Sequence, residues 1–477
     1  MPPNVTSELI LDAPTNNKGP KTFRRADIVK SLDHGQNQTD YSMDEPWNII
    51  IDNKVYDIRD FVRDHPGGAV ILTHIGKDAT DAFSNFHPES AYEILANLYV
   101  GDIAADDMVT SKKGFTTELR DMKQQFKNLG YFESSKAYYT FKVLTNLSIL
   151  TISVSILIRY GGTLSGVLLS SFFMGVFWQQ CGWLSHDFLH HQVFEQRKWN
   201  NVMAHFLGAI CLGFSPSWWK DKHNTHHASP NVHGQDPDIS THPILTWSEY
   251  ALSDLFTSEN DAPPTIYSPE VSRFLVKYQP LFYFPILHFA RISWCIQSFL
   301  FVLPGWKKFE TNDPRMPVNP AELVGLVLHH AWYFITIYLF IPKAWLALAF
   351  YFTSQAMGGL LISLVFVLNH NGMKILTMEE SHNMDFFAQQ VVTGRDIIAS
   401  NPSFQWCVDW FCGGLNYQIE HHLFPTMPRH HFHKVQLKIQ LLCEKYNIPY
   451  HRTTFIKGTQ EVLRRLGQVS AASWKLA

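Results

Sequence analysis

The sequence predicts two structural parts: a small α+β domain, then an all-α integral membrane domain in which four transmembrane helices form two hairpins beneath a cytosolic, histidine-rich cap. Three observations support this fold class. The 477 residues exceed a single domain of roughly 100 to 200 residues. Hydrophobic residues make up 46% of the chain and charged residues only 17%, and long apolar runs begin after residue 139. The 24 histidines gather near the ends of those runs.

The same composition excludes two classes of protein. A disordered chain is poor in hydrophobic residues, so this one must bury much of its length. The formal net charge of −3 offers no strong basic field for a polyphosphate backbone, so nucleic acid is not an expected partner. The six cysteines form no CxxC pair, which favours reduced, structural thiols.

The soluble part begins after a polar arm, residues 1–44, which we expect to be flexible. The arm has no apolar core of a signal peptide, so the N-terminus is expected in the cytosol. Residues 47–51 and 54–58 are two β-type runs around the turn dipeptide Asp52-Asn53. The small domain is predicted over residues 45–105, and a charged linker follows over residues 106–138.

A haem signal lies within this small domain. In the segment His65-Pro66-Gly67-Gly68, the glycines let the backbone turn sharply and approach a flat ligand. His87 follows among aromatic residues that can wall a planar ring. Two histidines can bind haem iron from opposite faces, so His65 and His87 are the predicted axial ligands. His74 is the rival second ligand, but it lies close to His65 along the chain.

The membrane domain is predicted over residues 139–450, with a cytosolic tail over residues 451–477. A helix needs about 20 mostly apolar residues to cross a bilayer. Four segments satisfy this and pair through short turns: 141–158 with 164–184, and 323–341 with 344–368. The segment 281–303 is long enough but contains Arg291, and a mid-bilayer charge is costly. We therefore expect that segment to be interfacial or half-buried.

Three histidine-rich motifs follow or flank these segments. The first is His186-Asp187-Phe188-Leu189-His190-His191, in which residues four apart share a helix face and Asp187 can orient an imidazole. His191 is an alternative to His190. With the two hairpins, all motifs return to the cytosolic face. The predicted metal ligands are His186, His190, His223, His226, His227, His370, Gln418, His421 and His422.

So many donors point to two metals, because one metal rarely uses more than six ligands. A haem electron carrier in the same chain makes sense beside a redox-active centre, which disfavours zinc and favours two irons. The competing interpretation is that these histidines only contact lipid headgroups. No catalytic residue is predicted beyond the metal centre.

Together, the HPGG segment with its downstream histidine, HDxxH, HxxHH and the Gln418-Ile419-Glu420-His421-His422 box resemble the front-end fatty acyl desaturases with an N-terminal cytochrome b5 domain. The resemblance covers residues 45 to about 450 and is closest to fungal delta-6 enzymes. It implies a haem b, a di-iron centre, O2 as oxidant, and NADH as the external electron source through a cytochrome b5 reductase. It also implies a multi-pass endoplasmic reticulum protein with both termini cytosolic.

The resemblance implies a substrate as well: a C18 polyunsaturated acyl chain, carried by CoA or a phospholipid. The implied reactions are linoleate to gamma-linolenate and alpha-linolenate to stearidonate. Delta-5 or delta-8 (sphingolipid) front-end desaturation and acyl hydroxylation by a b5-fused di-iron enzyme are the alternatives. A membrane-tethered electron carrier, in which only His65 and His87 function, leaves three histidine motifs unexplained.

Overall fold

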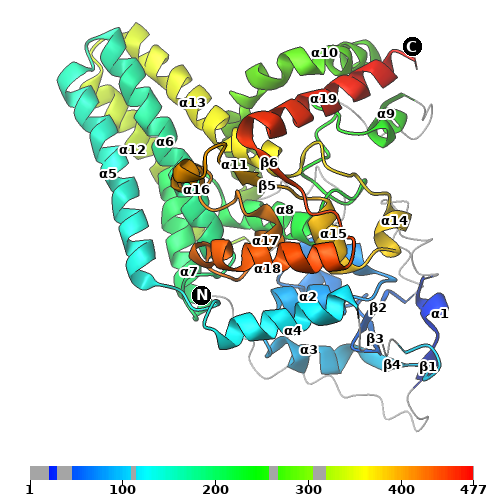
Figure 1. Ribbon diagram of the computed structural model, residues 1–477. Coiled ribbons are helices and arrows are strands. Elements are labelled where there is room, and N and C mark those ends of the chain that lie inside the picture. Colours follow the sequence, from blue (N-terminus) through cyan, green and yellow to red (C-terminus); the bar gives the residue numbers. More distant parts are fainter. Residues whose placement is uncertain (1–20, 30–45, 109–113, 257–266, 304–317, 476–477) are drawn as a thin grey trace. The chain divides into compact units, whose positions relative to one another are not determined.

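The structure is a computed structural model, and it describes residues 21–29, 46–108, 114–256, 267–303 and 318–475. The chain forms two compact units. Unit 1 contains the described residues of Met1–Phe61, His74–Thr80 and Pro88–Thr110. Unit 2 contains those of Val62–Thr73, Asp81–His87 and Ser111–Ala477. Figure 1 labels the helices and strands of both units.

Unit 1 is built on a four-stranded sheet with the order β1-β4-β3-β2. The strands are β1 (Lys21–Phe23), β2 (Asn48–Ile51), β3 (Lys54–Asp57) and β4 (Tyr99–Ile103). The predicted hairpin is present: β2 and β3 pair antiparallel around Asp52 and Asn53, whose φ angles are 52° and 60°. Asp and Asn tolerate this left-handed conformation, which matches the twist of a two-residue hairpin.

The structure differs from the sequence prediction in the N-terminal arm. Residues 21–29 of the predicted arm form β1 and helix α1 (Arg25–Val29), and β1 pairs parallel with β4. Ile28 is fully buried, and its apolar side chain joins the core formed by Ile50, Val55 and Ile103. The remainder of the predicted arm lies outside the described residues.

Unit 2 contains four long helices that lie side by side (Figure 1). They are α5 (Lys136–Tyr160), α6 (Leu164–Leu189), α12 (Ala321–Phe340) and α13 (Ala344–His370). Ser135 and Thr163 cap the N-termini of α5 and α6 by accepting hydrogen bonds from backbone N–H groups. Ser153 and Ser170 then bond to each other across the α5–α6 pair. Such small hydroxyl residues allow apolar helices to approach closely.

Among the described residues, three helices, α5, α12 and α13, are long and apolar enough to cross a membrane, and a fourth span results if the bent pair α10 and α11 counts as one. Helix α6 is as long, but Gln179, Gln180 and several Ser and Gly residues make it less apolar. The mostly helical membrane domain is confirmed, and the arrangement of four spans in two hairpins stays a prediction.

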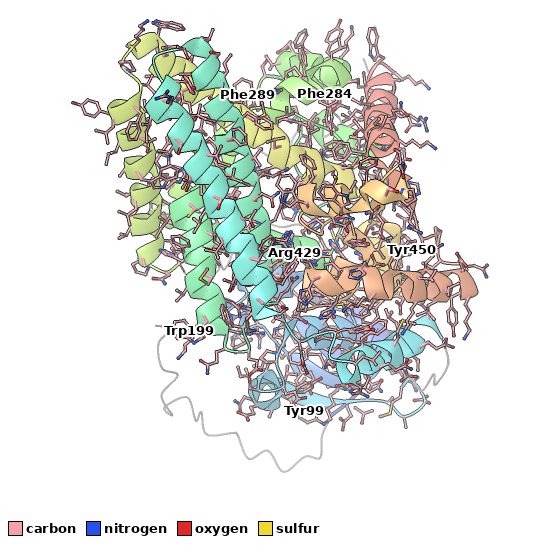
Figure 2. The ribbon with its side chains drawn as sticks, turned by 60° about the vertical axis from the view of Figure 1, so that its left-hand side comes forward. Tyr99, Trp199, Phe284, Phe289, Arg429 and Tyr450 are labelled. Carbon is pink, nitrogen blue, oxygen red and sulfur yellow. The ribbon has the colours of Figure 1, made fainter. Side chains whose placement is uncertain are left out.

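The segment predicted to be interfacial forms two helices. Helices α10 (Pro269–Leu287) and α11 (Ala290–Val302) meet at an angle of 78°. Figure 2 labels Phe284, in the last turn of α10, and Phe289, which lies between the two helices and is 65% exposed. Arg291, in contrast, is 1% exposed and points into the protein. The charge of Arg291 alone therefore did not predict that its side chain is buried in the protein.

The remaining helices of unit 2 build a cap around the polar ends of α6 and α13. Residues of the predicted linker and tail belong to this folded unit, because α4 and α19 carry buried apolar residues such as Phe126 and Leu466. The cap elements are α4 (Phe115–Asn128), α7 (Arg197–Ala204), η4 (His205–Leu212, a π-helix), α8 (Pro216–Ala228), α9 (Glu249–Phe256), α14 (Met378–His382), α15 (Phe386–Val392), β5 (Asp396–Ile398), α16 (Gln405–Phe411), α17 (Gln418–Leu423), α18 (Phe432–Lys445), β6 (Arg452–Thr454) and α19 (Phe455–Ser473).

Candidate functional site

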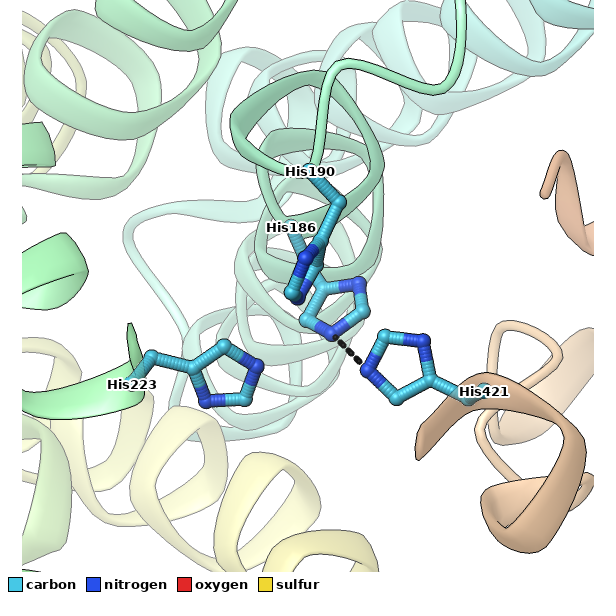
Figure 3. A group of neighbouring side chains, drawn as sticks. All are labelled: His186, His190, His223 and His421. Atoms are coloured by element: carbon cyan, nitrogen blue, oxygen red, sulfur yellow. Dashed lines mark hydrogen bonds between the residues drawn. The ribbon is translucent and has the colours of Figure 1, made fainter. Parts of the chain in front are cut away.

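Four histidines from three helices form the first cluster, which Figure 3 shows. Their candidate ligand atoms all lie within 4.8 Å of one another. The closest pair is His186 Nε2 and His421 Nε2, 3.1 Å apart. Trp219 stacks on His223 with 4.1 Å between ring centroids, and it also contacts the rings of His186 and His190. The cluster consists of His186 and His190 from the end of α6, His223 from α8 and His421 from α17.

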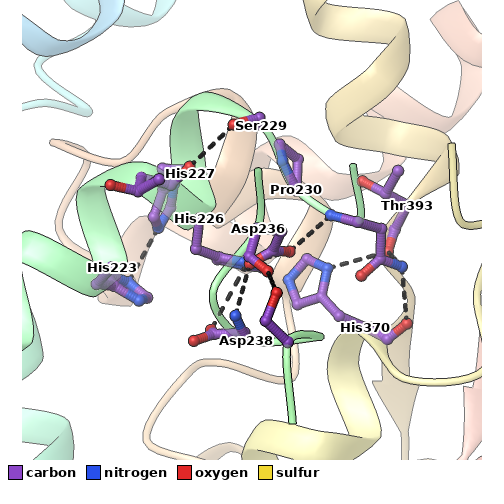
Figure 4. A network of polar contacts seen from close by, with 12 residues as sticks. His223, His226, His227, Ser229, Pro230, Asp236, Asp238, His370 and Thr393 are labelled. Atoms are coloured by element: carbon purple, nitrogen blue, oxygen red, sulfur yellow. Dashed lines mark hydrogen bonds and ion pairs between the residues drawn. The ribbon is translucent and has the colours of Figure 1, made fainter. Parts of the chain in front are cut away.

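Three histidines form the second cluster, of which Figure 4 shows His226 and His370. His226 comes from α8, His370 from the end of α13 and His422 from α17. His370 Nε2 and His422 Nε2 are 3.0 Å apart. Helix α8 and helix α17 therefore each supply both clusters, and the adjacent residues of α17 point to different ones.

The structure also places the remaining predicted ligands. His227 lies between the clusters: its Nε2 is 3.0 Å from His223 Nε2, and its ring stacks on His422. Gln418 joins the second cluster, because its Nε2 is 2.7 Å from His370 Nε2 while Asn369 donates to its Oε1. His191 stands apart from both clusters and faces Lys220, because α6 ends at Leu189 and His191 has a positive φ.

Burial makes most of these imidazoles neutral donors. The pKa values of His223, His421 and His422 lie well below the ordinary range, because burial and then the neighbouring histidines disfavour the charged form. His226 behaves differently. Burial lowers its pKa, but the carboxylates of Asp236 and Asp238 outweigh burial and raise the pKa to about 9. A neutral imidazole is the form that binds metal.

Groups that the sequence reasoning missed orient the second cluster. Asp236 Oδ2 is 2.9 Å from His226 Nδ1, and the backbone N–H of Asn231 donates to the same oxygen. The carbonyl of Thr393 lies 3.0 Å from His370 Nδ1, and Gln390 Oε1 lies 2.8 Å from His422 Nδ1. In the neutral form of each ring, these partners accept the Nδ1 proton and leave Nε2 free to bind a metal. Asp236 follows His226 by ten residues in a polar loop, which was the one sequence signal for it.

Two buried carboxylates hold the helices that carry the ligands. Asp187 forms an ion pair of 2.7 Å with Arg429 Nε, and its Oδ1 is 3.4 Å from His186 Nδ1. Figure 2 labels Arg429. Glu322 of α12 accepts hydrogen bonds from Ser215 and Ser217, including the Ser217 N–H, at the N-terminus of α8. A carboxylate at this end complements the helix dipole.

The two clusters fit a pair of metal ions. His190 Nε2, His227 Nδ1 and His421 Nδ1 are buried and have no hydrogen-bond partner among the described residues. Facing Nε2 atoms 3.0 to 3.1 Å apart suit neighbouring ligands of one ion. Imidazole nitrogens at roughly 2.1 Å from a metal and about 90° apart lie about 3 Å from each other. All-imidazole donors suit iron, copper, zinc and nickel.

A cavity of about 710 Å³ opens onto these histidines. His186, His223, His226, His370 and Gln418 line it at the clusters. Its apolar wall includes Phe214, Trp294 and Phe366, and polar residues such as Lys222 and Thr241 also line it. A pocket of this size with a largely apolar wall suits a long apolar ligand.

The predicted haem ligands also face each other. The ring centroids of His65 and His87 are 6.0 Å apart. Two imidazoles that bind one iron at opposite faces through bonds of roughly 2 Å have centroids about 6 Å apart. His65 Nδ1 lies 2.9 Å from the Gly68 carbonyl, and His87 Nδ1 lies 3.2 Å from that of Phe83, so Nε2 is the unprotonated nitrogen in both. A Cβ on Gly67 would lie 2.7 Å from His65 Cε1, which explains the glycine.

Comparisons with known proteins agree with this geometry. A family model described as fatty acid desaturase matches residues 163–454, and one described as a cytochrome b5-like heme/steroid binding domain matches residues 36–104. The chain is 39% identical to the acyl-lipid (9-3)-desaturase of Physcomitrium patens over 89% of this chain and 76% of that protein.

Two relatives come from Caenorhabditis elegans. The chain is 32% identical to a Delta(5) fatty acid desaturase over 90% of this chain and 97% of that protein. It is also 32% identical to a Delta(6)-fatty-acid desaturase over 87% of this chain and 94% of that protein. Because the identity to these two differently named enzymes is equal, sequence similarity identifies the family but does not distinguish the position of the double bond.

Proposed function

Because the chain belongs to the fatty acid desaturase family, as a front-end member fused to a cytochrome b5-like domain, we propose that it is a delta-6 desaturase of C18 polyunsaturated acyl chains. The single observation that carries a desaturase reaction is the cavity of about 710 Å³ whose wall contains members of both histidine clusters. The delta-6 position rests on the sequence resemblance and on the name of the nematode relative.

We propose that each cluster holds one iron. His186, His190, His223 and His421 form one binding site, and His226, His370 and His422 form the other. His227 lies between them and is assigned as a further ligand. Gln418 is assigned to the second iron through Oε1, which requires its amide to turn over from the orientation that the bond from Asn369 gives. When bound, the irons would supply the oxidative chemistry, in which O2 and electrons are consumed, two hydrogens leave the acyl chain, and water forms.

The protein's own residues bind and orient the substrate. The apolar wall formed by Phe214, Trp294 and Phe366 holds the acyl chain and excludes water. Trp219 packs against His223 and Gln390 accepts a hydrogen bond from His422, so each keeps an imidazole in place. Holding one methylene pair beside the metals supplies the proximity that such a reaction needs. The carrier is acyl-CoA or a phospholipid, for which the polar lining residues Lys222 and Thr241 offer contacts.

We infer that His65 and His87 would hold a haem, which would supply one-electron transfer with NADH and a cytochrome b5 reductase as the external electron source. The apolar helices place the protein in a membrane. We propose that this membrane is the endoplasmic reticulum and that both termini lie in the cytosol. This topology would place the haem and the histidine clusters on the same side, so that electrons need not cross the membrane.

The test is expression in yeast supplied with linoleate, followed by mass spectrometry of double-bond positions. We expect a new delta-6 bond that the His421→Ala variant does not produce, because His421 lies in the first cluster. A new double bond at delta-5 or delta-8 would support the desaturase reaction but contradict the delta-6 position. A hydroxylated product would favour the hydroxylase alternative, and absence of any new product in cells that contain the haem-loaded protein would contradict the proposal.

A further inference from the structure

Arg291, near the start of α11, is a fully buried cation with no carboxylate within 4.0 Å in the described part of the chain. Its guanidinium lies over the ring of Trp178, 3.4 Å from the centroid. Its Nη1 donates to Gln355 Oε1. A charged side chain inside an apolar helical bundle is expensive, and such residues commonly mark functional positions. The clusters and the capping carboxylates described above do not use it.

The cation is stabilised by the end of a helix. The last carbonyls of a helix lack partners within it and carry partial negative charge. Arg291 Nη2 donates to the Leu212 carbonyl at the end of η4, at 2.7 Å. The same nitrogen lies 2.9 Å from His329 Nε2. Arginine can only donate, so His329 accepts there and its Nδ1 donates to the Ile210 carbonyl, at 3.1 Å.

These contacts join four elements with little spare room. Trp178 belongs to α6, Leu212 to η4, His329 to α12 and Gln355 to α13. A Cβ on Gly358 would lie 2.9 Å from Arg291 Cδ and 2.9 Å from Trp178 Cε3. The planar guanidinium therefore sets the spacing between α11 and its neighbours, as a fork with fixed donor directions does.

Of the elements that Arg291 joins, α6, η4 and α13 also line the cavity, as does α11 itself. Leu212 gives its carbonyl to Arg291 and lines the cavity as well. Ala290 and Trp294, one residue before and three after Arg291, line it from α11. Ile362 and Phe366 line it from α13, which holds Gln355. A change in the position of α11 therefore changes the depth of the cavity without touching a metal ligand.

We propose that Arg291 is a positioning residue that sets the depth of the apolar end of the cavity, and thereby selects the length of the acyl chain. This inference rests on the proposed desaturase function. One methylene in an apolar pocket changes discrimination by roughly 10- to 200-fold. A small displacement of α11 is therefore enough to change the preferred substrate.

The test compares Arg291→Lys and Gln355→Leu with the matched control Arg273→Lys, because Arg273 is exposed on α10. Lysine keeps the charge but lacks the fork, and leucine removes one acceptor. Cells receive C16, C18 and C20 substrates together, and products are measured per haem-loaded and iron-loaded protein. We expect the product ratio between chain lengths to change by about tenfold in Arg291→Lys and by less in Gln355→Leu. The control should keep the wild-type ratio.

A second readout needs no turnover: the rise in unfolding temperature of the purified protein with saturated chains of increasing length. We expect the chain length with the largest rise to differ between wild type and Arg291→Lys. Unchanged ratios and an unchanged length optimum would overturn the inference. If Arg291→Lys does not fold, an unchanged ratio and optimum in Gln355→Leu overturn it. A wild-type protein that forms no unsaturated product would instead contradict the proposed function.

Discussion

In the second histidine cluster, each imidazole has a hydrogen-bond partner at Nδ1: Asp236, the Thr393 carbonyl or Gln390, at 2.8 to 3.0 Å. In the first cluster, the described residues provide such a contact only between His186 and Asp187, at 3.4 Å. Instead, the indole of Trp219 packs against three of its four rings. Hydrogen bonds at Nδ1 therefore orient the imidazoles of the second cluster, whereas those of the first are held mainly by packing. The same type of ligand thus needs a different substitution in each cluster to disturb its position.

The largest expected effect is on the first cluster, through Asp187→Leu. The substitution leaves the Arg429 guanidinium buried without its ion-pair partner, 2.7 Å away in the wild type. Loss of one partner of a buried pair costs about 3 to 5 kcal/mol of the free energy of unfolding. Thermal unfolding of the detergent-purified protein measures it. The double variant Asp187→Leu with Arg429→Met should recover part of the loss, and equal losses in single and double variants would refute this account.

An intermediate effect is expected on the second cluster, through Asp236→Asn. The fold should persist, but His226 loses the carboxylate that orients it, 2.9 Å from Nδ1. Loss of such a partner typically lowers metal affinity by about 10- to 100-fold. Iron per chain should fall toward one, as measured by elemental analysis. Asp238→Asn is the matched control, because Asp238 is 3.6 Å from the same nitrogen and should cost less iron. Equal iron content in Asp236→Asn and wild type would contradict the prediction.

The smallest effect is expected from Glu322→Gln, and it should fall on both clusters alike. Glu322 caps α8, which supplies His223 to one cluster and His226 to the other. Loss of a capping interaction costs about 1 kcal/mol. The unfolding temperature should fall slightly, and both irons should be removed by a chelator at a similarly increased rate. Faster removal of only one iron would show that α8 does not couple the two sites. Glu322→Ala, with a larger drop in unfolding temperature, would confirm the direction.

Sequence spacing grouped histidines that the structure brings together, but it did not predict how they divide between two clusters. The HxxHH pattern indicates that His223, His226 and His227 share one side of a helix, and they do gather there. Which cluster each one joins depends on how α17 packs against α8, and no local pattern encodes this packing. The choice between His190 and His191 likewise depended on where α6 ends.

The fold shows the same limit. The hairpin at Asp52 and the long apolar helices follow from local residue types and run lengths. Arg291 does not, because the sequence shows the cost of its charge but not the helix-end carbonyl of Leu212 that offsets it. Asp236 was missed for a similar reason: its contact with His226 comes from the fold of a loop.

The sharing of α8 and α17 by both clusters has an evolutionary consequence. His421 and His422 are neighbours in the chain but serve different clusters, and so do His223 and His226 within one helix. A deletion or insertion of one residue in either helix rotates ligands of both clusters together. Such a change in either helix therefore alters both clusters, whereas loss of one cluster alone requires substitution of a single ligand or of its own hydrogen-bond partner, such as Asp236.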